Sequence, residues 1–369
     1  MKIALAHDFL TYLGGAERVL KVLSDIFPAA PIYTLLYDEE KMGQYFPKER
    51  VRSSNLQHSI FKNRKQFLLS KFPIAVEQFD FSDYDLVISS SGAWMKGILT
   101  KPETRHICYC HGPMRFAWDR QAEYLASKNI KGLKKYFVLK LLNKVRNWDK
   151  LSSDRPDLYL ANSNAIKELI AKNYKPQRGP LAGLEARVLY PPVDVQRFEI
   201  HNKDQGYYLI VSRLSPYKNI ELAVRAFADL PDQELIIIGT GEQQEYLKKI
   251  ATSNVKLLGF KADKETKKYF ENCHAFIFPG EDDFGITPVE AMACGKPVLA
   301  FGKGGALETI RDGETGTFFR ENNKKSFLTA LQKLEQTKFD PAKIRMRAEE
   351  FSTEVFVKKI KEIVEDNRS

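Results

Sequence analysis

Residues 279–310 read PGEDDFGITPVEAMACGKPVLAFGKGGALETI, and this stretch decides the fold. A buried strand is expected to end at Pro279-Gly280, followed by an acidic cluster and a turn at Phe284-Gly285-Ile286. Pro288 is expected to begin a helix with Glu290 in its first turn, because proline suits that position and a carboxylate complements the helix dipole. A strand, a glycine turn and a helix in this order indicate one unit of an α/β sheet.

The glycines of this stretch add a second feature. Gly295 is expected to end the helix, and Gly302, Gly304 and Gly305 to form a loop where backbone groups approach closely. The helix dipole explains the position of Glu290. It does not explain why an acidic cluster and glycine turns crowd into the same few residues, so the stretch indicates a binding site.

Apolar runs alternate with helix-length segments along the whole chain. The alternation predicts parallel sheets covered by helices on both faces, and hence the α/β fold class. The nine expected strands are residues 1–6, 84–89, 106–109, 158–161, 206–211, 234–238, 255–258, 275–278 and 297–300. With 369 residues the chain is long enough for two domains.

The domain boundary is expected within residues 190–194. These residues read YPPVD, stand between the two series of strands, and suit a short stiff linker. The expected domains are residues 1–190 and 191–350. Residues 351–369 are expected to form a C-terminal helix that packs back on the first domain.

Charge is unevenly distributed along the chain. The net charge is +10; residues 1–200 carry 31 Lys+Arg against 21 Asp+Glu, whereas residues 201–369 carry 26 of each. Residues 101–150 alone hold 12 basic and 4 acidic side chains, which indicates an anionic partner such as nucleic acid or an anionic membrane. Residues 133–148 predict an amphipathic basic helix. If this helix faces outward, Phe137 and Trp148 are expected to insert into a membrane whose anionic surface binds Lys131, Lys134, Lys135, Lys140, Lys144 and Arg146. The alternative is an ordinary surface helix docked on its own domain.

The composition also excludes several classes of protein and of site. No apolar run reaches the length of a membrane span, and the N-terminal residues become charged too early for a secretory signal, so a cytosolic location is expected. Asp83 and Asp85 have the spacing of a metal-binding pair, but they precede a strand and are interpreted as a loop. No metal site is expected.

Cysteine usage favours thiols over disulfides or zinc. The four cysteines are Cys108, Cys110, Cys273 and Cys294. They are too few and too scattered for a disulfide framework. Zinc ligation by Cys108, Cys110 and His111 with Cys273-His274 is the alternative, but paired C-x-x-C spacing is lacking. Buried thiols are therefore expected.

Two further segments follow expected strands and contain residues that suit phosphate groups. Gly14-Gly15 stands before a helix after the first strand, where backbone N–H groups and the helix dipole favour an anion. The alternative for this glycine pair is a plain turn. Arg213 and Lys218 follow the first strand of the second half, and ligands bind at the carboxyl ends of parallel strands. Gly239-Thr240-Gly241 adds a second glycine turn. These glycine turns and the two cations suit a nucleoside diphosphate.

The order of these motifs resembles family-4 retaining glycosyltransferases of the GT-B fold. The resemblance covers nearly the whole chain and rests on Gly14-Gly15, Tyr109-Cys110-His111-Gly112-Pro113, Ala161-Asn162-Ser163, residues 190–194, Arg213 and Lys218. It implies two Rossmann-like domains whose parallel sheets face each other across a deep cleft. Within the family, the chain is most similar to bacterial mannosyltransferases of polysaccharide and O-antigen assembly.

The acidic residues depart from the family pattern at one position. The pattern has two glutamates separated by seven residues; Glu290 matches the second, but the first falls on Asp282, with Glu281 one place too early. The resemblance implies that Asp282 contacts a hydroxyl of the donor sugar and that Glu290 holds the nucleotide ribose. It leaves open whether Glu281 fills the first role instead.

The resemblance also assigns the remaining site residues. Arg213 and Lys218 are expected to bind the leaving diphosphate, and His111 to border the donor sugar. Further donor-binding positions are Gly14, Gly15, Phe284, Gly285, Ile286, Gly259 and Phe260.

The implied function is transfer of a hexose with retention of configuration. Mannose from GDP-mannose is the expected donor, and a saccharide or lipid-linked saccharide is the expected acceptor. The reaction is expected to need no metal or other cofactor, and the enzyme to contact the inner face of an anionic membrane but no nucleic acid. The alternatives are a nucleotide-sugar epimerase of the same fold and a non-catalytic sugar-binding or membrane-scaffold protein.

Overall fold

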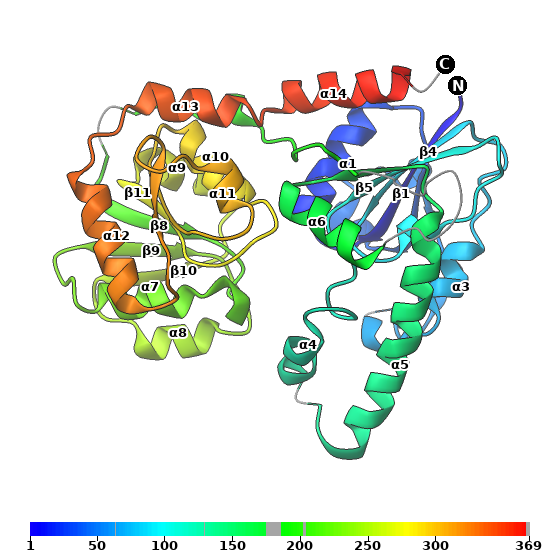
Figure 1. Cartoon of the computed structure of the whole chain (residues 1–369), viewed down its shortest axis with the longest axis horizontal. Helices are drawn as coiled ribbons and strands as arrows, with labels where there is room; N and C mark the ends of the chain where they lie inside the picture. The colour runs from blue at the N-terminus through cyan, green and yellow to red at the C-terminus, as the bar shows by residue number, and fades with distance from the viewer. Residues whose placement is uncertain (63, 129, 175–185, 202–203, 367–369) are drawn as a thin grey trace. The chain divides into compact units, whose positions relative to one another are not determined.

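The computed structural model describes residues 1–62, 64–128, 130–174, 186–201 and 204–366. The chain divides into two compact units, Met1–Leu189 and Tyr190–Ser369. Each unit is an α/β body around a parallel sheet (Figure 1), so the expected fold class of two Rossmann-like domains is confirmed. The last helix, α14, spans Thr353–Glu365, and residues 367–369 of the expected C-terminal helix lie outside the described residues.

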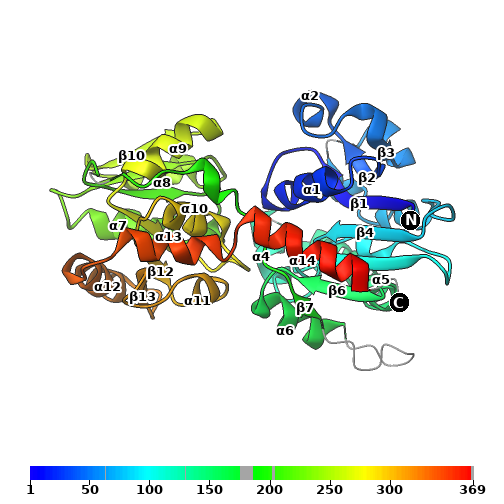
Figure 2. The ribbon, with the colours of Figure 1, turned by 90° about the horizontal axis from the view of Figure 1, so that it is seen from above.

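The first unit contains a seven-stranded parallel sheet. Its strands are β1 Ile3–Leu10, β2 Ile32–Tyr37, β3 Val51–Ser53, β4 Leu86–Ser91, β5 Arg105–Cys110, β6 Leu158–Ala161 and β7 Arg187–Val188. Their spatial order is β3-β2-β1-β4-β5-β6-β7 (Figure 2). The chain therefore winds in opposite directions from β1, and the two windings meet between β1 and β4. Ligands of open α/β sheets bind at such a switch point, beyond the carboxyl ends of the strands.

Helices cover both faces of this sheet. The helices of the first unit are α1 Gly15–Ile26, α2 Glu39–Met42, α3 Phe72–Glu77, α4 Gln121–Ser127, α5 Gly132–Leu151 and α6 Asn164–Asn173. The strand register places Ala6 beside Ser89 and Ser89 beside Cys108 on one face, which packs against α3, α5 and α6. The opposite face carries His7 and Ser90, and Glu17 of α1 covers it.

The second unit repeats the plan with six parallel strands. They are β8 Tyr207–Val211, β9 Glu234–Ile238, β10 Val255–Gly259, β11 Ala275–Phe278, β12 Val298–Phe301 and β13 Gly316–Phe319. Their order is β10-β9-β8-β11-β12-β13, with the switch point between β8 and β11. The helices are α7 Ile220–Phe227, α8 Gln244–Ile250, α9 Asp263–Asn272, α10 Ile286–Ala293, α11 Ala306–Thr309, α12 Lys324–Gln336, α13 Pro341–Glu349 and α14.

Successive side chains of these strands belong alternately to two separate hydrophobic cores, one on each face of the sheet. Leu209 and Phe276 belong to a core with α9, α10 and α13. Ile210 and Ile277, one residue further along their strands, belong to a core with α7, α8 and α12. Because successive side chains of a strand point to opposite faces, a sheet covered on both sides needs nearly continuous apolar runs. The short runs visible in the sequence meet this requirement.

Several expected strand boundaries differ from the structure by one or two residues, and two differences bear on the site. The first strand does not end at Ala6 but runs to Leu10, because its residues continue the ladder with β2. Helix α10 begins at Ile286 rather than Pro288, since Gly285 takes a left-handed backbone (φ 90°) as its N-cap. Glu290 therefore lies in the second turn of α10, not the first. Pro288 is tolerated because the first N–H groups of a helix have no partner within it.

All four cysteines are buried free thiols, as expected. Within the described ranges, no group of three or more His, Cys, Asp and Glu side chains could hold a metal ion. No described helix is both long enough and apolar enough to cross a bilayer.

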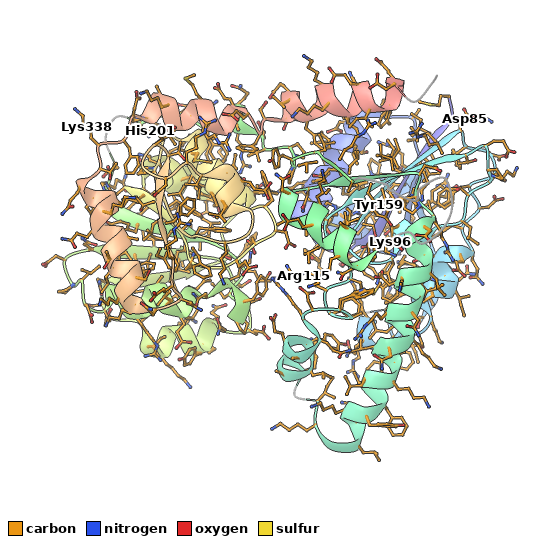
Figure 3. All side chains as sticks on the ribbon, in the orientation of Figure 1. Asp85, Lys96, Arg115, Tyr159, His201 and Lys338 are labelled. Carbon is orange, nitrogen blue, oxygen red and sulfur yellow. The ribbon has the colours of Figure 1, made fainter. Side chains whose placement is uncertain are left out.

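A buried ion pair attaches the C-terminal part of α5 to the first unit. Lys96 lies between α5 and the sheet (Figure 3), with its Nζ 3.0 Å from Asp149 Oδ1 and 2.8 Å from Ser152 Oγ. Trp118 Nε1 donates to the other carboxylate oxygen of Asp149 at 2.7 Å. Removing one partner of such a pair leaves a buried charge uncompensated, which is strongly destabilising. This end of α5 is therefore firmly attached.

Candidate active site

Two loops meet at the switch point of the second unit. Residues 212–219 follow β8, residues 279–285 follow β11, and β8 and β11 are neighbours. Gly280 lies so close to the first loop that a Cβ there would stand 2.7 Å from Lys218 Cα. The sequence motifs therefore converge at the edge of the sheet where ligands of this architecture bind.

The structure brings Lys218 and Asp282 together. Lys218 Nζ forms an ion pair with Asp282 Oδ2, and both side chains are largely buried. Arg213 is exposed, with Nη2 donating to Tyr217 Oη at 3.1 Å. The site thus presents one exposed guanidinium and one ammonium group that a carboxylate holds in place. Both are cations of the kind that bind a diphosphate.

Asp282 and Glu281 differ in their surroundings. Asp282 is partly buried, and its main-chain oxygen accepts a hydrogen bond from Gly305 N at 2.9 Å. Glu281 is exposed. The shorter acid therefore faces the cation, and the loop that contains Gly305 fixes its backbone.

The loop glycines are required by close backbone contacts. A Cβ at Gly305 would lie 2.3 Å from Phe284 Cα, and one at Gly304 would lie 2.5 Å from Asp282 O. A Cβ at Gly239 would lie 1.9 Å from Ser212 O. Side chains at these positions would push the loops apart, so the glycines permit the convergence of the site.

We expect Gly305→Ala to destabilise the second unit and weaken donor binding. The added methyl group must displace the backbone at Phe284, and such overpacking costs about 1–3 kcal/mol. Urea unfolding measures the loss, and titration with a nucleotide measures binding. The matched control is Gly92→Ala, where a Cβ would meet nothing closer than 3.8 Å. Equal stability of the two variants would contradict the close approach.

Glu290 is held by an arginine that sequence reasoning missed. Arg197 Nη2 lies 2.6 Å from Glu290 Oε1, and its Nη1 lies 3.5 Å from Asp263 Oδ2. Glu290 is buried, so the guanidinium compensates its charge. Arg197 links the start of α9 to the middle of α10. Arg197 and Glu290 are 93 residues apart in the sequence, so no local motif could have predicted this ion pair.

The expected backbone donors lie at the start of α10. Phe284 is buried against Tyr190 and Phe351, and Gly285 forms the N-cap. The first N–H groups of a helix lack partners within it and carry partial positive charge, which suits sugar hydroxyls or phosphate oxygens. At the end of β10, Gly259 has a positive φ of 69° and Phe260 is 77% exposed. Phe260 thus presents an uncovered aromatic ring at the same edge of the sheet.

In the first unit, a carboxylate occupies part of the expected anion site. Gly14 caps α1, and its N–H donates to Glu17 Oε2 at 2.9 Å. Burial by itself would raise the pKa of Glu17. The hydrogen bond to His7, the charge of His7 and hydrogen bonds from backbone N–H groups together outweigh the effect of burial, so the pKa of Glu17 is lowered. Glu17 is therefore an anion at the N-terminus of α1. Phosphate binding by Gly14 and Gly15 stays a prediction.

Asp8 fixes the loop that follows β4. Its Oδ1 accepts hydrogen bonds from Trp94 N at 2.9 Å and Met95 N at 2.7 Å, and its Oδ2 accepts one from Gly92 N at 2.8 Å. His111, directly after β5, lies at the same edge of the sheet. Desolvation lowers the pKa of His111 to about 4, with His7 adding to the shift. The His111 ring is therefore neutral near pH 7.

A lysine that sequence reasoning missed faces these groups. Lys65 Nζ donates to Thr11 Oγ1 at 2.9 Å and lies 4.0 Å from the centre of the Phe9 ring. Burial lowers the pKa of Lys65, while the charges of Glu17 and Asp8 oppose the shift. Lys65 lies 54 residues from Thr11 in the sequence, so no local motif could have predicted this contact.

Comparison with known proteins shows which families and folds this chain resembles. Residues 194–367 match the family model of the glycosyl transferases group 1. This part of the chain is similar to the group 1 glycosyltransferase domain. It contains Arg197, Arg213, Lys218, Asp282 and Glu290, and its extent nearly coincides with the second unit.

Relatives extend the likeness beyond the group 1 domain. An uncharacterized glycosyltransferase of Methanocaldococcus jannaschii is 26% identical over 340 residues, 88% of this chain and 85% of that protein. The alpha-1,3/1,6-mannosyltransferase ALG2 of Kluyveromyces lactis is 26% identical over 379 residues, 84% of this chain and 71% of that protein. These matches support a glycosyltransferase.

Solved structures share the fold of both units. HepE of Anabaena, crystallised with UDP and glucose, has a TM-score of 0.70 at 21% identity and covers 99% of each chain. Sucrose-phosphate synthase of Thermosynechococcus elongatus has a TM-score of 0.72 at 16% identity, again over 99% of each chain. The two units of this chain therefore follow each other along the sequence in the same order as in these folds.

Proposed function

We propose that this protein transfers a hexose from a nucleoside-diphosphate sugar to a saccharide or lipid-linked saccharide, with retention of configuration. The observation that carries the proposal is the convergence of Arg213 with the Lys218–Asp282 pair at the switch point of the group 1 domain. Cations there match the charge that grows on a departing diphosphate, and a carboxylate accepts hydrogen bonds from sugar hydroxyls.

The proposed step exchanges one bond at the anomeric carbon for another. The bond from C1 to the diphosphate oxygen breaks, and its electron pair stays on the diphosphate. The acceptor oxygen forms the new bond to C1 on the same face of the sugar, and its proton passes to the leaving phosphate oxygen. Such a step needs positioning and charge stabilisation rather than a strong base. Arg213 and Lys218 supply that charge, so the proposed reaction requires no metal.

Mannose is the proposed hexose, with GDP-mannose as donor. Its support is the likeness to alpha-1,3/1,6-mannosyltransferases, one of which covers 90% of this chain at 23% identity. A panel of GDP-mannose, UDP-glucose and UDP-galactose, scored by release of the nucleoside diphosphate, tests the donor. We expect release from GDP-mannose. Activity confined to UDP-sugars would contradict GDP-mannose as the donor. The absence of release from every donor would contradict the proposal that the protein is an enzyme.

We also propose that the first unit contacts an anionic membrane through the N-terminal part of α5. Figure 1 shows this part extending away from the sheet with α4 beside it. Leu133 is 74% exposed, and Tyr136 and Phe137 are each 61% exposed. We call these three residues the apolar tip. Apolar side chains that protrude among lysines are typical of interfacial helices.

Lysines and a pocket surround the apolar tip. The exposed lysines of this region are Lys131, Lys134, Lys135, Lys140 and Lys144. A pocket of about 640 Å³ lies where α4 meets α5, and Leu125, Ile130 and Leu139 line it together with Lys131 and Lys135. Apolar walls beside two ammonium groups suit the chain and phosphate of a lipid. A lipid-linked acceptor at the cytoplasmic face would bring the enzyme to such a surface.

The structure corrects the expected membrane contacts at two positions. Trp148 Nε1 donates to Glu77 Oε1 at 2.9 Å, and its ring packs on Trp94. Arg146 Nε donates to Ala117 O at 2.6 Å. Both side chains pack on the rest of the first unit, because the buried ion pair between Lys96 and Asp149 attaches the C-terminal half of α5 to it. The proposed membrane contact therefore extends along α5 no further than Lys144.

Removing two tip lysines should weaken binding to anionic vesicles. Each lysine near an anionic leaflet contributes about 1 kcal/mol, so Lys134→Gln with Lys135→Gln should lower partitioning on the order of thirtyfold at low salt. The matched control is Lys248→Gln with Lys249→Gln, an adjacent exposed lysine pair on α8 with the same charge loss. Sedimentation with vesicles of varied phosphatidylserine content measures both. Equal losses in the two variants would rule out the tip as the contact.

A further inference from the structure

One residue of the second unit has an unusual backbone conformation, and it directly follows Lys218. Asn219 has φ 53° and ψ 31°, in the left-handed region. Among the described residues it is the only one other than glycine with a positive φ. This conformation is costly for a residue with a Cβ, and asparagine tolerates it better than most because its short polar side chain forms local hydrogen bonds. Such strain persists only where surrounding contacts hold it, and it is concentrated at functional sites.

The side chain of Asn219 connects three loops at the carboxyl edge of the sheet. Its Nδ2 donates to Pro279 O at 3.2 Å, in the loop after β11, and to Asn322 Oδ1 at 2.7 Å, in the loop after β13. A carbonyl oxygen only accepts, so the amide must turn its NH₂ group toward Pro279, and both of its hydrogens are then used. Asn219 itself ends the loop after β8.

Close backbone contact joins the same two loops one residue away. A Cβ at Gly280 would stand 2.7 Å from Lys218 Cα and 2.8 Å from Lys218 O. Asn219 N donates to Pro216 O at 3.0 Å, which closes a 3-10 turn over residues 216–218. The left-handed Asn219 ends this turn and is the N-cap of α7. The main chain at Lys218 is therefore held from both sides.

These contacts determine where the ammonium group of Lys218 lies. Lys218 Nζ pairs with Asp282 Oδ2, which belongs to the same loop as Pro279. A lysine side chain is a flexible four-carbon stem with a charge at its end. Its ion pair keeps one geometry only where the two loops stay at a constant separation, and the amide of Asn219 bridges that separation.

We propose that Asn219 is a positioning residue: it clamps the loop after β8 to the loop after β11, so that Lys218 is presented at the diphosphate site. The role of Lys218 toward a diphosphate rests on the proposed function, whereas the clamp between the loops does not. Asn219 has no contact with substrate in this proposal, and its effect on turnover passes through Lys218.

Two substitutions separate the side chain of Asn219 from its backbone. Asn219→Gly removes the amide and leaves the left-handed conformation accessible, whereas Asn219→Ala removes the amide and makes that conformation costly. With the best donor of the panel, we expect kcat to fall about tenfold in Asn219→Gly, with a smaller change in KM. The fall should be larger in Asn219→Ala. Unchanged kcat in both variants would overturn the proposal.

A double variant tests whether the effect passes through Lys218. In a Lys218→Met background, Asn219→Gly should lower kcat by about twofold or less, because the group that it positions is absent. The same fall in both backgrounds would overturn the proposed route, since independent sites give additive effects.

The chemical reactivity of Lys218 tests the clamp without turnover. The full chain is treated with a trace of acetic anhydride, and mass spectrometry measures the acetylation rate of each lysine, with the exposed Lys248 as internal reference. We expect Lys218 to react several-fold faster in Asn219→Gly than in the wild-type protein, as it should in Asp282→Asn. An unchanged rate in Asn219→Gly would overturn the clamp. Absence of turnover in the wild-type protein would contradict the proposed function alone.

The matched control is Asn254→Gly. Asn254 stands directly before β10, at the opposite edge of the same sheet, and its amide also joins segments of the main chain. Its Nδ2 lies 2.8–2.9 Å from three main-chain oxygens, those of Phe227, Leu230 and Gln233. This variant should lower the urea midpoint comparably but leave kcat and the reactivity of Lys218 unchanged. Equal changes in the two variants would indicate general loosening of the unit and overturn the positioning role.

Discussion

Arg213→Ala should lower kcat by a factor on the order of a hundred or more, with a smaller change in KM. Negative charge on the diphosphate rises as the bond to C1 breaks, and Arg213 is an exposed cation at that edge of the sheet. Losing one well-placed donor to such a charge costs roughly 2.7–4 kcal/mol of transition-state stabilisation. Steady-state kinetics with the best donor of the panel measures the loss.

The matched control for this prediction is Arg225→Ala. Arg225 is also an exposed arginine of the second unit, but it pairs with Glu221 and Tyr246 on the surface of α7 and α8. Its removal should leave kcat nearly unchanged. Near wild-type turnover in Arg213→Ala would remove Arg213 from the diphosphate site.

Asp282→Asn should impair turnover strongly, whereas Glu281→Gln should do little. Asp282 is ion-paired with Lys218, while Glu281 is exposed. Lys218→Met should also lower kcat by about a hundredfold, since it removes a second cation from the growing charge. Because the pair acts as a unit, the double variant should lose less than the sum of the single losses, with a coupling of about 0.5–3 kcal/mol.

The ranking of the two acids decides which one fills the first acidic role. A larger loss in Glu281→Gln than in Asp282→Asn would assign the role to Glu281. Indifference to both substitutions would favour a binding protein without turnover. Purely additive losses for Lys218→Met and Asp282→Asn would show that their ion pair is not maintained in the working enzyme.

Most of the fold could be predicted from the sequence because each central strand carries its own apolar run. The nine expected strands correspond to β1, β4, β5, β6 and β8 to β12. The strands that were not predicted are β2, β3, β7 and β13. β3 and β7 have only three and two residues and exist as strands because a neighbouring strand supplies their hydrogen bonds. No local pattern marks such edges.

The candidate site was less predictable, because its residues meet through tertiary contacts. The cations and acids stand at strand ends that the sequence places correctly. Lys218 pairs with Asp282 across 64 residues of chain, and Arg197 pairs with Glu290 across 93 residues. Both pairs depend on which loops and helices the fold brings together, and no local pattern shows this. Lys65 and the contacts of Ser90 with His7 and His111 likewise required the sheet register. Helical periodicity placed Trp148 on the apolar stripe of its helix but could not show whether that stripe faces a membrane; its ring packs on Trp94 instead.

One measurement tests the central claim most directly: the anomeric configuration of the product formed from a nucleotide sugar and a saccharide acceptor. Carbon–proton coupling at C1 is compared between donor and purified product, and the second product is identified by chromatography. The account predicts an elongated saccharide with the configuration of the donor, together with one nucleoside diphosphate per bond formed. An inverted linkage, or a free epimerised sugar nucleotide with no elongated saccharide, would contradict retaining hexosyl transfer by this chain.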